Sequence, residues 1–415
     1  MESGRLAVVY DHGSASPSDI LLAAEGLATP LLVCDPSVPH VRDLLPLLSD
    51  LVETVTVPAG ADRAALAAAL RDHRIDGVVT FSDAALRLTA AVAEAVGRPF
   101  HSPATAVRLT DKLAQREALR AAGLAVPRFA AVVPGAEAPD VGLPAVLKPR
   151  RSNGSRHTYA IGDREDLAAA LAAVAGLHER YGGFTLEERI IGDPEIAGPA
   201  WGDYVSVESL VLDGTVHHLG AIGRMPVTPP FRETGIFFPS TLSAERLASV
   251  EAEAEAAVHA LGITVGLCHT EIKLTARGPV VIEVNGRLGG ETAKIIHAST
   301  GADLVRMALA AALGDTATAL AEADRMRHGP GTVSYQISAF AAGSGTLDGL
   351  DGLDQVRAVE GVWRVVPCKA HGETVDVDMG TFSELASVYG VTTDHTRLRH
   401  AMRIVERVVV PRWRG

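Results

Sequence analysis

The sequence predicts a mixed α/β protein with roughly two to four domains. Three observations lead to this class. At 415 residues the chain is too long for one ordinary core. Apolar residues make up 47% and charged residues 21%, which is typical of a folded globular protein. Short β-like runs alternate with helical patterns along residues 1–104, as they do in a doubly wound α/β domain.

Composition excludes several classes of function. The formal net charge of −12 argues against a nucleic-acid-binding surface, which needs clustered Lys and Arg. No apolar run is long enough for a bilayer, and the first residues lack the apolar core of a signal peptide. Cys34, Cys268 and Cys368 are far apart and lack metal-ligand spacing. We therefore expect a cytoplasmic protein with neither a nucleic-acid partner nor a membrane partner.

Residues 1–104 are expected to alternate between buried strands and helices. No G-x-G-x-x-G opens the first helix, and no P-loop occurs anywhere, so neither common phosphate-binding fingerprint is available. The expected strands are 5–11, 30–35, 52–58 and 75–83, and the expected helices are 19–27 and 61–74.

The middle of the chain continues with longer elements. One helix is expected from Ser102 to Gly123, because it has a Ser-Pro start, a glycine stop and Pro127 beyond it. Asp213-Gly214 predicts a β-hairpin. Other expected elements are two short strands joined by a polar loop in 143–161, a helix over 164–182, a strand over 184–192 and a helix capped by Ser243. From about 330 we expect a separate small α+β unit, with strands at 331–340, 361–367 and 403–410.

The stretch "HTEIKLTARGPVVIEVNGR" (269–287) predicts a hairpin with acids on both strands. If residues 276–278 form a three-residue loop with Gly278 left-handed, Glu271 faces Glu283. The other expected pairs are Thr275 with Pro279, Lys273 with Val281, and His269 with Asn285. Like charges directly opposite each other are destabilising, so the two acids need a reason. A four-residue loop would put them on opposite faces and remove the argument.

A divalent cation between Glu271 and Glu283 is the simplest reason, with Asn285 adding a neutral oxygen. An all-oxygen site suits Mg²⁺ better than zinc, and Mg²⁺ usually takes further ligands from substrate phosphates. The alternative is a solvated edge strand, on which the repulsion between the acids is weak.

Phosphates bound without a P-loop need cations from other segments. Lys148 ends a buried-looking strand, just before a loop rich in Ser, Asn, Gly and Arg that could present backbone N–H groups to phosphate. Lys112 lies on a helix, where a solvated surface lysine is the alternative. Arg287 shares the face of Asn285 and could stabilise a transferring phosphate or an acyl phosphate. Its alternative is a surface pair with Glu291.

These motifs together resemble the ATP-grasp superfamily. The ordered series is "DKLAQREALRAAGLAVP", "PAVLKP", "TLEERIIG", "YVSVESLVLDG", "HTEIKLT" and "PVVIEVNGRLGG". It is most similar to carboxylate–amine ligases of the L-amino-acid (dipeptide-forming) type. The resemblance implies a doubly wound pre-ATP-grasp domain at 1–104, an ATP-grasp domain at 105–314 with a small lid at about 126–186, and a C-terminal α+β region at 315–415.

The resemblance also implies roles for individual residues. Lys112 and Lys148 would bind ATP phosphates, under a mobile lid loop from Ser152 to His157 that includes Ser155. A second group of roles concerns the nucleoside and the metal. The hinge that holds adenine would be Glu187, Glu188, Arg189 and Ile190. The acid that binds ribose would be Asp203, or Glu195 because the link 192–202 is long. The ligands of Mg²⁺, or of Mn²⁺ as an alternative ion, would be Glu271, Glu283 and Asn285. Arg287 would contact the acyl phosphate.

The activity implied is ATP-dependent formation of an amide or peptide bond, with ADP and phosphate as co-products. The partners would be a small-molecule carboxylate and an amine, each an amino acid or a peptide, and a homodimer is left open. One alternative keeps the fold but activates bicarbonate or formate. The other is a nucleotide-binding module without catalysis.

Overall fold

The N-terminal region forms a four-stranded parallel sheet in the order β3-β2-β1-β4. The computed structural model describes residues 4–58, 60–327 and 331–414. Strand order reverses at β1, so its carboxyl end and that of β4 flank a switch point, where α/β sheets commonly bind ligands. The strands are β1 (Gly4–Tyr10), β2 (Ala28–Cys34), β3 (Thr54–Thr56) and β4 (Gly77–Val79), and the helices are α1 (Pro17–Ala24), α2 (Pro39–Leu51), α3 (Arg63–Leu70) and α4 (Leu86–Val96).

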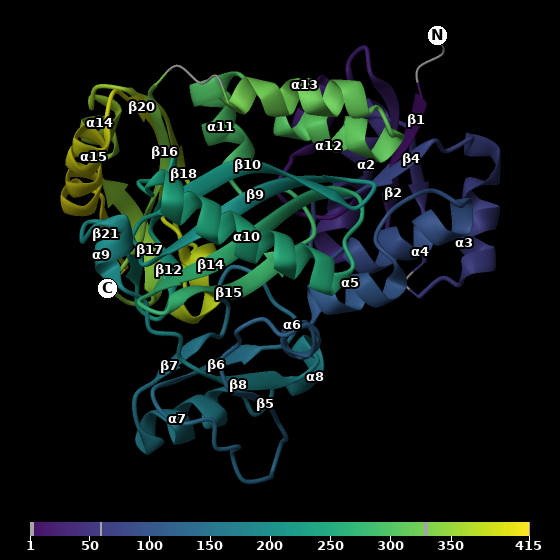
Figure 1. Ribbon diagram of the computed structural model, residues 1–415. Helices are drawn as coiled ribbons and strands as arrows, with labels where there is room; N and C mark the ends of the chain where they lie inside the picture. Colours follow the sequence, from purple (N-terminus) through teal and green to yellow (C-terminus); the bar gives the residue numbers. More distant parts are fainter. Residues whose placement is uncertain (1–3, 59, 328–330, 415) are drawn as a thin grey trace.

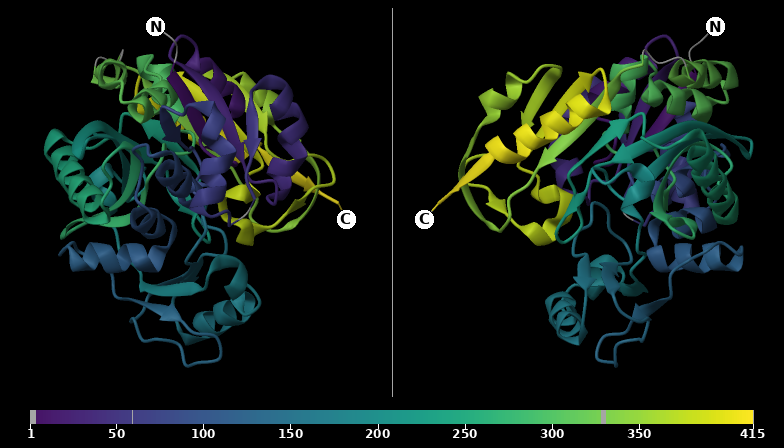
Figure 2. Two further views of the ribbon diagram at one scale, coloured as in Figure 1. Left: turned by 90° about the vertical axis from the view of Figure 1, so that its right-hand side faces the viewer. Right: turned by 60° about the vertical axis from the view of Figure 1, so that its left-hand side comes forward.

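A second, antiparallel sheet in the order β5-β8-β6-β7 forms a small lobe of its own (residues 129–188). It hangs below the rest of the molecule in Figure 1 and in both views of Figure 2. Its core is a separate apolar cluster that includes Leu147, Phe184 and Leu186. The elements are β5 (Phe129–Val132), β6 (Ala145–Pro149), β7 (Tyr159–Ile161), α7 (Arg164–Val174), α8 (His178–Tyr181) and β8 (Phe184–Glu188).

An eight-stranded antiparallel sheet, in the order β15-β14-β9-β10-β13-β16-β20-β18, forms the centre of the molecule. It combines strands from the middle of the chain with strands from its C-terminal part. The strands are β9 (Tyr204–Leu212), β10 (Thr215–Arg224), β13 (Gly235–Phe238), β14 (Gly266–Thr275), β15 (Gly278–Asn285), β16 (Val333–Ala339), β18 (Val362–Pro367) and β20 (Ala386–Thr392).

The two faces of this sheet pack against different partners. Val207 of β9 lies in a core with residues of α10 (Ala244–Leu261) and α15 (His395–Val408), and α10 crosses the sheet in Figure 1. Leu210 lies in a core shared with β1 and with α12 (Leu304–Leu313). Side chains of a strand alternate between faces, so Glu208 shares the face of Leu210. This face, which meets the N-terminal sheet, carries the polar residues of the site.

The remaining elements include connecting helices and the strands of two smaller sheets. They are η1 (Arg71–His73), α5 (Pro103–Thr110), α6 (Lys112–Ala121), α9 (Pro194–Ala197), β11 (Val227–Thr228), β12 (Arg232–Glu233), α11 (Thr292–Thr300), α13 (Thr316–Arg327), β17 (Gly345–Asp351), α14 (Leu353–Arg357), β19 (Thr374–Val375), η2 (Val377–Ser383) and β21 (Val410–Trp413). In the part of the chain that the structure describes, no helix combines the length and apolar character needed to cross a membrane.

The predicted mixed α/β class is confirmed, while three expected elements and the expected C-terminal unit differ. The helix expected over 164–182 is two helices, α7 and α8. The helix expected over 102–123 is two helices, α5 and α6, because Asp111 leaves helical geometry (φ −132°, ψ 108°) to cap α6. The strand expected at 403–410 is mostly helix α15, whose buried Leu398, Ala401 and Val405 have helical spacing. The separate C-terminal unit is also wrong, because β16 pairs with β13 and extends the central sheet.

Candidate active site

The β14–β15 hairpin brings the two predicted acids face to face by a route that differs from the expected one. Its turn holds two residues, because Thr275 pairs with Gly278 rather than Pro279, and Lys273 pairs with Val280 rather than Val281. The register then shifts between Glu271 and Ile272. Three pairs follow, including Glu271 with Glu283 and His269 with Asn285. A β-bulge therefore restores the pairing that the shorter turn alone would lose.

Each of the facing acids has a cation beside it. Glu283 Oε1 lies 2.5 Å from Lys112 Nζ. Glu271 Oε1 lies 3.6 Å from His269 Nε2 and 3.8 Å from Arg224 Nη2. Burial acts to raise the pKa of Glu271, but His269 and Arg224 outweigh it and lower this pKa to about 2. Glu271 is therefore a carboxylate at neutral pH, in the ionisation state that a metal ligand needs.

The donor set fits a magnesium ion that shares its ligands with a phosphate. Among the described residues, no three His, Cys, Asp or Glu side chains are grouped to enclose a metal ion. The predicted set instead offers two carboxylates and the amide oxygen of Asn285, whose residue is buried (7% exposed). Mg²⁺ is usually held by one or two carboxylates and completes its shell with water and substrate phosphates. Such an incomplete, all-oxygen set is what this hairpin provides.

A buried polar network, not foreseen from the sequence, supports Glu271 from behind. His269 Nδ1 lies 2.5 Å from Glu208 Oε1, and Arg224 Nη2 lies 2.9 Å from His269 Nε2. Arg224 also donates to Glu233 (2.9 Å), which accepts a second bond from the hydroxyl of Tyr204 (3.0 Å). These buried charges are paired, as burial in a low-dielectric interior requires. The network fixes the position of Arg224 next to Glu271.

A cavity of about 430 Å³ lies between the small lobe and the edge of the central sheet. The small lobe contributes β6, β8 and the loop after β6, and the sheet contributes β9, β14 and β15. Its lining includes every predicted site residue except Asn285 and Arg287, namely Lys112, Lys148, Ser155, Glu187, Glu188, Arg189, Ile190, Asp203, Glu271 and Glu283. Residues that are far apart in the sequence therefore converge on one hollow.

The break between α5 and α6 sets the position of Lys112. Asp111 accepts from the backbone N–H of Leu113 and Ala114, so Lys112 is the first residue of α6 rather than a mid-helix surface residue. Arg150 binds the Asp111 carboxylate from the small lobe (2.7 and 3.0 Å). Lys112 Nζ then reaches both Glu283 and the carbonyl of Ser152 (3.0 Å). The solvated alternative for Lys112 is thereby excluded.

Lys148 belongs to a buried charge cluster whose third member, Arg116, was missed in the sequence. Lys148 Nζ lies 2.9 Å from Glu187 Oε2, to which Arg116 also donates (3.0 and 3.1 Å). Burial acts to raise the pKa of Glu187, yet Arg116 and Lys148 lower it to about 2. Burial lowers the pKa of Lys148. Arg116 lies one helical turn after Lys112, and this i, i+4 spacing was the available signal.

The hinge and the link after it line the cavity wall. The backbone N–H groups of Glu188 and Arg189 donate to the carbonyls of Arg128 and Pro144. Asp203 Oδ1 binds Lys273 Nζ at 2.6 Å and faces the cavity. Glu195, the alternative ribose acid, is exposed on α9 and does not line the cavity. The geometry therefore favours Asp203 over Glu195.

Arg287 has a partner that the sequence did not suggest. Its Nη2 lies 2.5 Å from Asp83 Oδ2, in the loop after β4 of the N-terminal sheet. Burial acts to lower the pKa of Arg287, but Asp83 raises it. Glu291, the expected surface partner, binds Lys294 and Tyr389 instead. Arg287 thus joins the β14–β15 hairpin to the switch point of the N-terminal sheet. The sequence signal for this contact was the position of Asp83 directly after a buried strand.

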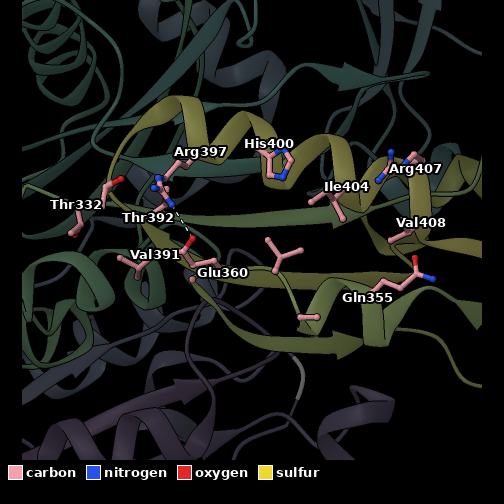
Figure 3. Close-up of a pocket in the computed structure, with 14 residues that line it drawn as sticks. Thr332, Gln355, Glu360, Val391, Thr392, Arg397, His400, Ile404, Arg407 and Val408 are labelled. Atoms are coloured by element: carbon pink, nitrogen blue, oxygen red, sulfur yellow. Dashed lines mark hydrogen bonds and ion pairs between the residues drawn. The ribbon is translucent and has the colours of Figure 1, made fainter.

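A larger hollow lies elsewhere and holds none of the predicted site residues. It has a volume of about 610 Å³ and lies between α15 and the end of β20. Figure 3 shows Arg397, His400 and Ile404 on its helical wall, and an ion pair from Arg397 to Glu360. Among the described residues that line it there is no pair of carboxylates and no lysine. Size alone therefore does not identify the site, and the chemistry favours the smaller cavity.

The comparison with protein families agrees with the ATP-grasp resemblance seen in the sequence. Residues 141–295 match the model of the ATP-grasp domain. This part of the chain is similar to an ATP-grasp domain. The matched stretch runs from the small lobe through the metal-ligand hairpin to α11. The ATP-grasp domain thus includes most of the cavity lining described above, although Lys112 and Arg116 precede the matched range.

The individual relatives of this chain are distant in sequence. The chain is 28% identical over 299 residues to the uncharacterized protein y4rH of Sinorhizobium fredii, covering 69% of this chain and 58% of that protein. It is 28% identical over 246 residues to carnosine synthase 1 of Homo sapiens, covering 53% of this chain and 28% of that enzyme. The chain therefore spans less than two thirds of the curated relatives it matches.

The solved structures bear on the fold alone. A crystal structure of an L-amino acid ligase from Bacillus licheniformis superimposes with a TM-score of 0.78 and 24% identity, covering 100% of this chain and 99% of that one. The likeness therefore extends beyond the ATP-grasp domain to the N-terminal sheet and to the C-terminal strands. The predicted ATP-grasp fold is confirmed.

Proposed function

We propose that this chain is an ATP-dependent carboxylate–amine ligase that joins an amino-acid-type carboxylate to an amine. The observation that carries the proposal is the facing pair Glu271 and Glu283, with Lys112 beside it, at the edge of a cavity whose opposite wall is the hinge. Similarity to a carnosine synthase and to the fold of an L-amino acid ligase supports the amino-acid class.

Each part of the cavity would meet a different part of the nucleotide. The hinge residues Glu187–Ile190 would hold adenine, and Asp203 would accept from the ribose hydroxyls. Lys112 and Lys148 would bind the phosphates together with Ser155. Glu187 already balances the charge of Lys148, which keeps that lysine in the cavity before ATP arrives. Glu271, Glu283 and Asn285 would hold Mg²⁺, or Mn²⁺ as an alternative, whose charge would offset that of the phosphate oxygens.

The reaction would proceed in two steps. A carboxylate oxygen attacks the γ-phosphorus of ATP, the bond to the β-phosphate oxygen breaks, and an acyl phosphate and ADP result. The amine then attacks the acyl carbon, phosphate leaves with the bonding electron pair, and an amide forms as the nitrogen loses a proton. Arg287 would stabilise the oxyanion that develops between these events. The loop Ser152–His157 would exclude water from the acyl phosphate.

Two alternatives differ in a measurable way. A ligase of bicarbonate or formate would use the same nucleotide site but would not need an amino acid. A nucleotide-binding module would bind ATP without turnover. Both acids and both lysines line one cavity together with the predicted hinge residues, which favours a working enzyme over a binding module.

The test is phosphate release from ATP and Mg²⁺ across a panel of amino acids, singly and in pairs, with bicarbonate and formate as separate arms. We expect release that requires a specific pair and that falls by about 10³-fold in Glu283→Gln. Glu360→Gln, at the exposed ion pair of the larger hollow, is the matched control and should keep wild-type turnover. Turnover with bicarbonate or formate alone, or ATP binding without any turnover, would select the corresponding alternative.

The remaining expectations from the sequence extend this proposal. We propose domain limits of 1–104, 105–314 (with the lid at about 126–186) and 315–415, where the last region contributes strands to the central sheet rather than folding as a separate unit. We also propose a cytoplasmic location, with which the three free thiols of Cys34, Cys268 and Cys368 are compatible. The partners would be small molecules, and a homodimer is an alternative to the monomer.

A further inference from the structure

The loop over the cavity, Ser152–His157, is bonded to a C-terminal segment that lies far away in the sequence. The backbone N–H of Thr381 donates to the carbonyl of Gly154 (2.8 Å). The backbone N–H of His157 donates in turn to the carbonyl of Asp378 (2.7 Å). Both acceptors and both donors belong to the backbone, so the contact depends on how closely the two chains approach. We call residues 376–383 the clasp segment.

Two glycines make this approach close enough. A Cβ added to Gly380 would lie 2.1 Å from the carbonyl oxygen of Gly154, which is far inside van der Waals contact. A Cβ added to Gly154 would lie 2.8 Å from the ring of Phe382. The guanidinium of Arg156 stacks over the same ring, with its Cζ 4.1 Å from the centroid. The loop and the clasp segment therefore interlock through backbone, a glycine pair and one cation–π contact.

The loop is held in a conformation that it would not adopt freely. Ser155 (φ 55°) and His157 (φ 48°) lie in the left-handed region although neither is a glycine. Such residues are unfavourable and persist only where surrounding contacts impose them. The two hydrogen bonds to the clasp segment involve Gly154, which directly precedes Ser155, and His157 itself. The C-terminal contacts are thus the part of the structure that imposes the loop conformation.

The clasp segment is itself anchored next to the buried polar network that supports Glu271. Ser383 donates to the carbonyl of Gly380 (2.7 Å) and is approached by the buried Arg232 (3.5 Å). Arg232 also donates to the carbonyl of Ala341 (2.9 Å). The next residue, Glu233, binds Arg224, which lies 3.8 Å from Glu271. A continuous series of contacts therefore runs from the loop to one of the facing acids.

We propose that the clasp segment positions the loop Ser152–His157 over the nucleotide, with Gly380 and Phe382 as positioning residues. The assignment rests on the proposed function for the identity of the nucleotide, but the clasp itself does not. Its consequence is that nucleotide exchange requires the C-terminal contacts to break, so weakening them opens the loop. The C-terminal region then serves the ATP site as well as the central sheet.

Limited trypsin digestion tests the clasp without any activity. Cleavage after Arg151 and Arg156, measured by mass spectrometry against cleavage after the exposed Arg42 of α2, reports opening of the loop. We expect about a tenfold increase in Gly380→Ala and a smaller one in Phe382→Ala, since each loses part of the interlock. Gly372→Ala is the matched control, because Gly372 has φ +84° and nothing within 4 Å of an added Cβ.

Nucleotide measurements then separate positioning from a structural role. Binding of a fluorescent ATP analogue should weaken by about tenfold in Gly380→Ala and should stay unchanged in Gly372→Ala. KM for ATP should rise more than kcat falls, because the lysines and the facing acids stay in place. Thermal unfolding of each variant shows whether it is folded, and Phe382→Ala carries the test if Gly380→Ala is not.

Three outcomes would overturn the proposal. Wild-type cleavage in both clasp variants would mean that the contacts do not hold the loop. An equal increase of cleavage in Gly380→Ala and Gly372→Ala would mean that the substitutions destabilise the protein in general. Faster cleavage with unchanged binding of the analogue would remove the role at the nucleotide site. A wild-type protein that binds ATP analogues but never releases phosphate would instead contradict the proposed function and leave the clasp standing.

Discussion

At the scale of single residues, burial decides how much an ion pair matters in this protein. Glu187 and Glu188 are neighbours at the end of β8, and each binds an arginine: Arg116 and Arg128. The side chains of the first pair are 2% and 4% exposed, and those of the second are 64% and 42% exposed. Removing one partner of a buried pair leaves an uncompensated charge in the interior, whereas water screens an exposed pair. The two adjacent pairs therefore form a natural comparison.

Arg116→Gln should lower the free energy of unfolding by about 3 kcal/mol, because Glu187 would keep only Lys148 as a partner. Urea unfolding measures the change. Arg128→Gln, the matched exposed variant, should change it by less than about 0.5 kcal/mol. Equal effects of the two substitutions would mean that Glu187 is protonated or hydrated, against the geometry described above.

Glu187 should also make stability depend on pH in the acid range. The cations lower its pKa in the folded state from 4.5 to about 2, although burial opposes this shift. A depressed carboxyl pKa contributes stability above pH 4.5, and that contribution is lost as the pH falls from 4.5 toward 2. At pH 3, we expect a loss of about 2 kcal/mol relative to neutral pH that is absent from Glu187→Gln. Urea unfolding at both pH values measures it, and parallel pH profiles would contradict it.

At the scale of elements, a single capping residue determines where Lys112, a proposed phosphate-binding lysine, is placed. Asp111 ends α5, caps α6 and binds Arg150 of the small lobe. It therefore fixes the start of α6, and with it Lys112, relative to Lys148 on β6. Loss of an N-cap costs about 1 kcal/mol, and loss of a buried carboxylate that pairs with an arginine adds to this.

Asp111→Ala should lower the free energy of unfolding by about 2 kcal/mol and raise KM for ATP. Asp163→Ala is the matched control, because Asp163 caps α7 with the same pair of backbone bonds. Helix α7 contacts β7, whereas α6 contacts β5 at the opposite edge of the small-lobe sheet. Asp163→Ala should cost about 1 kcal/mol and leave KM unchanged. Nucleotide titration and urea unfolding give the two numbers for each variant. An unchanged KM in Asp111→Ala would show that Lys112 is held by other contacts.

The sequence was informative about elements where the signal was local. Asp213-Gly214 does join β9 and β10, and Ser243 does cap α10. The break at Asp111 was missed although its cap is local, since Asp111 accepts from the backbone N–H groups of Leu113 and Ala114. Only its bond to Arg150, which lies 39 positions away, could not be read from the sequence. The facing acids were predicted through an incorrect turn, because a β-bulge inside a strand leaves no mark in residue type. For the contact between Arg287 and Asp83, the sequence offered only the position of Asp83 after a buried strand, which does not identify its partner.

At the scale of the whole molecule, apolar cores divide the structure differently from its sheets. One core joins Leu6 of the N-terminal sheet, Leu210 of the central sheet and Leu304 of α12. The small lobe has its own core around Leu147 and Phe184. Segments that share a core unfold together, whereas a separate core permits local unfolding at lower free energy. The N-terminal and central sheets should thus behave as one unit, and the small lobe as another.

Hydrogen exchange should separate these two units. Leu147→Ala should cost about 2 to 5 kcal/mol within the small lobe and speed exchange in peptides from 129–188 only. Leu210→Ala, a substitution of the same size in the shared core, should speed exchange in the N-terminal and central sheets together. Mass spectrometry of peptic fragments measures both. Faster exchange throughout the chain in Leu147→Ala would contradict the division.

The strand order of the central sheet has a consequence for synthesis on the ribosome. β13 lies between β10 and β16, and β16 follows it only after α10, the β14–β15 hairpin and three further helices have been made. At about 5–20 residues per second, the outer edge of β13 stays without its neighbour for several seconds. An unpaired edge is a template for association with other chains. A nascent chain stalled before Val333 would therefore present this edge to chaperones or to other nascent chains.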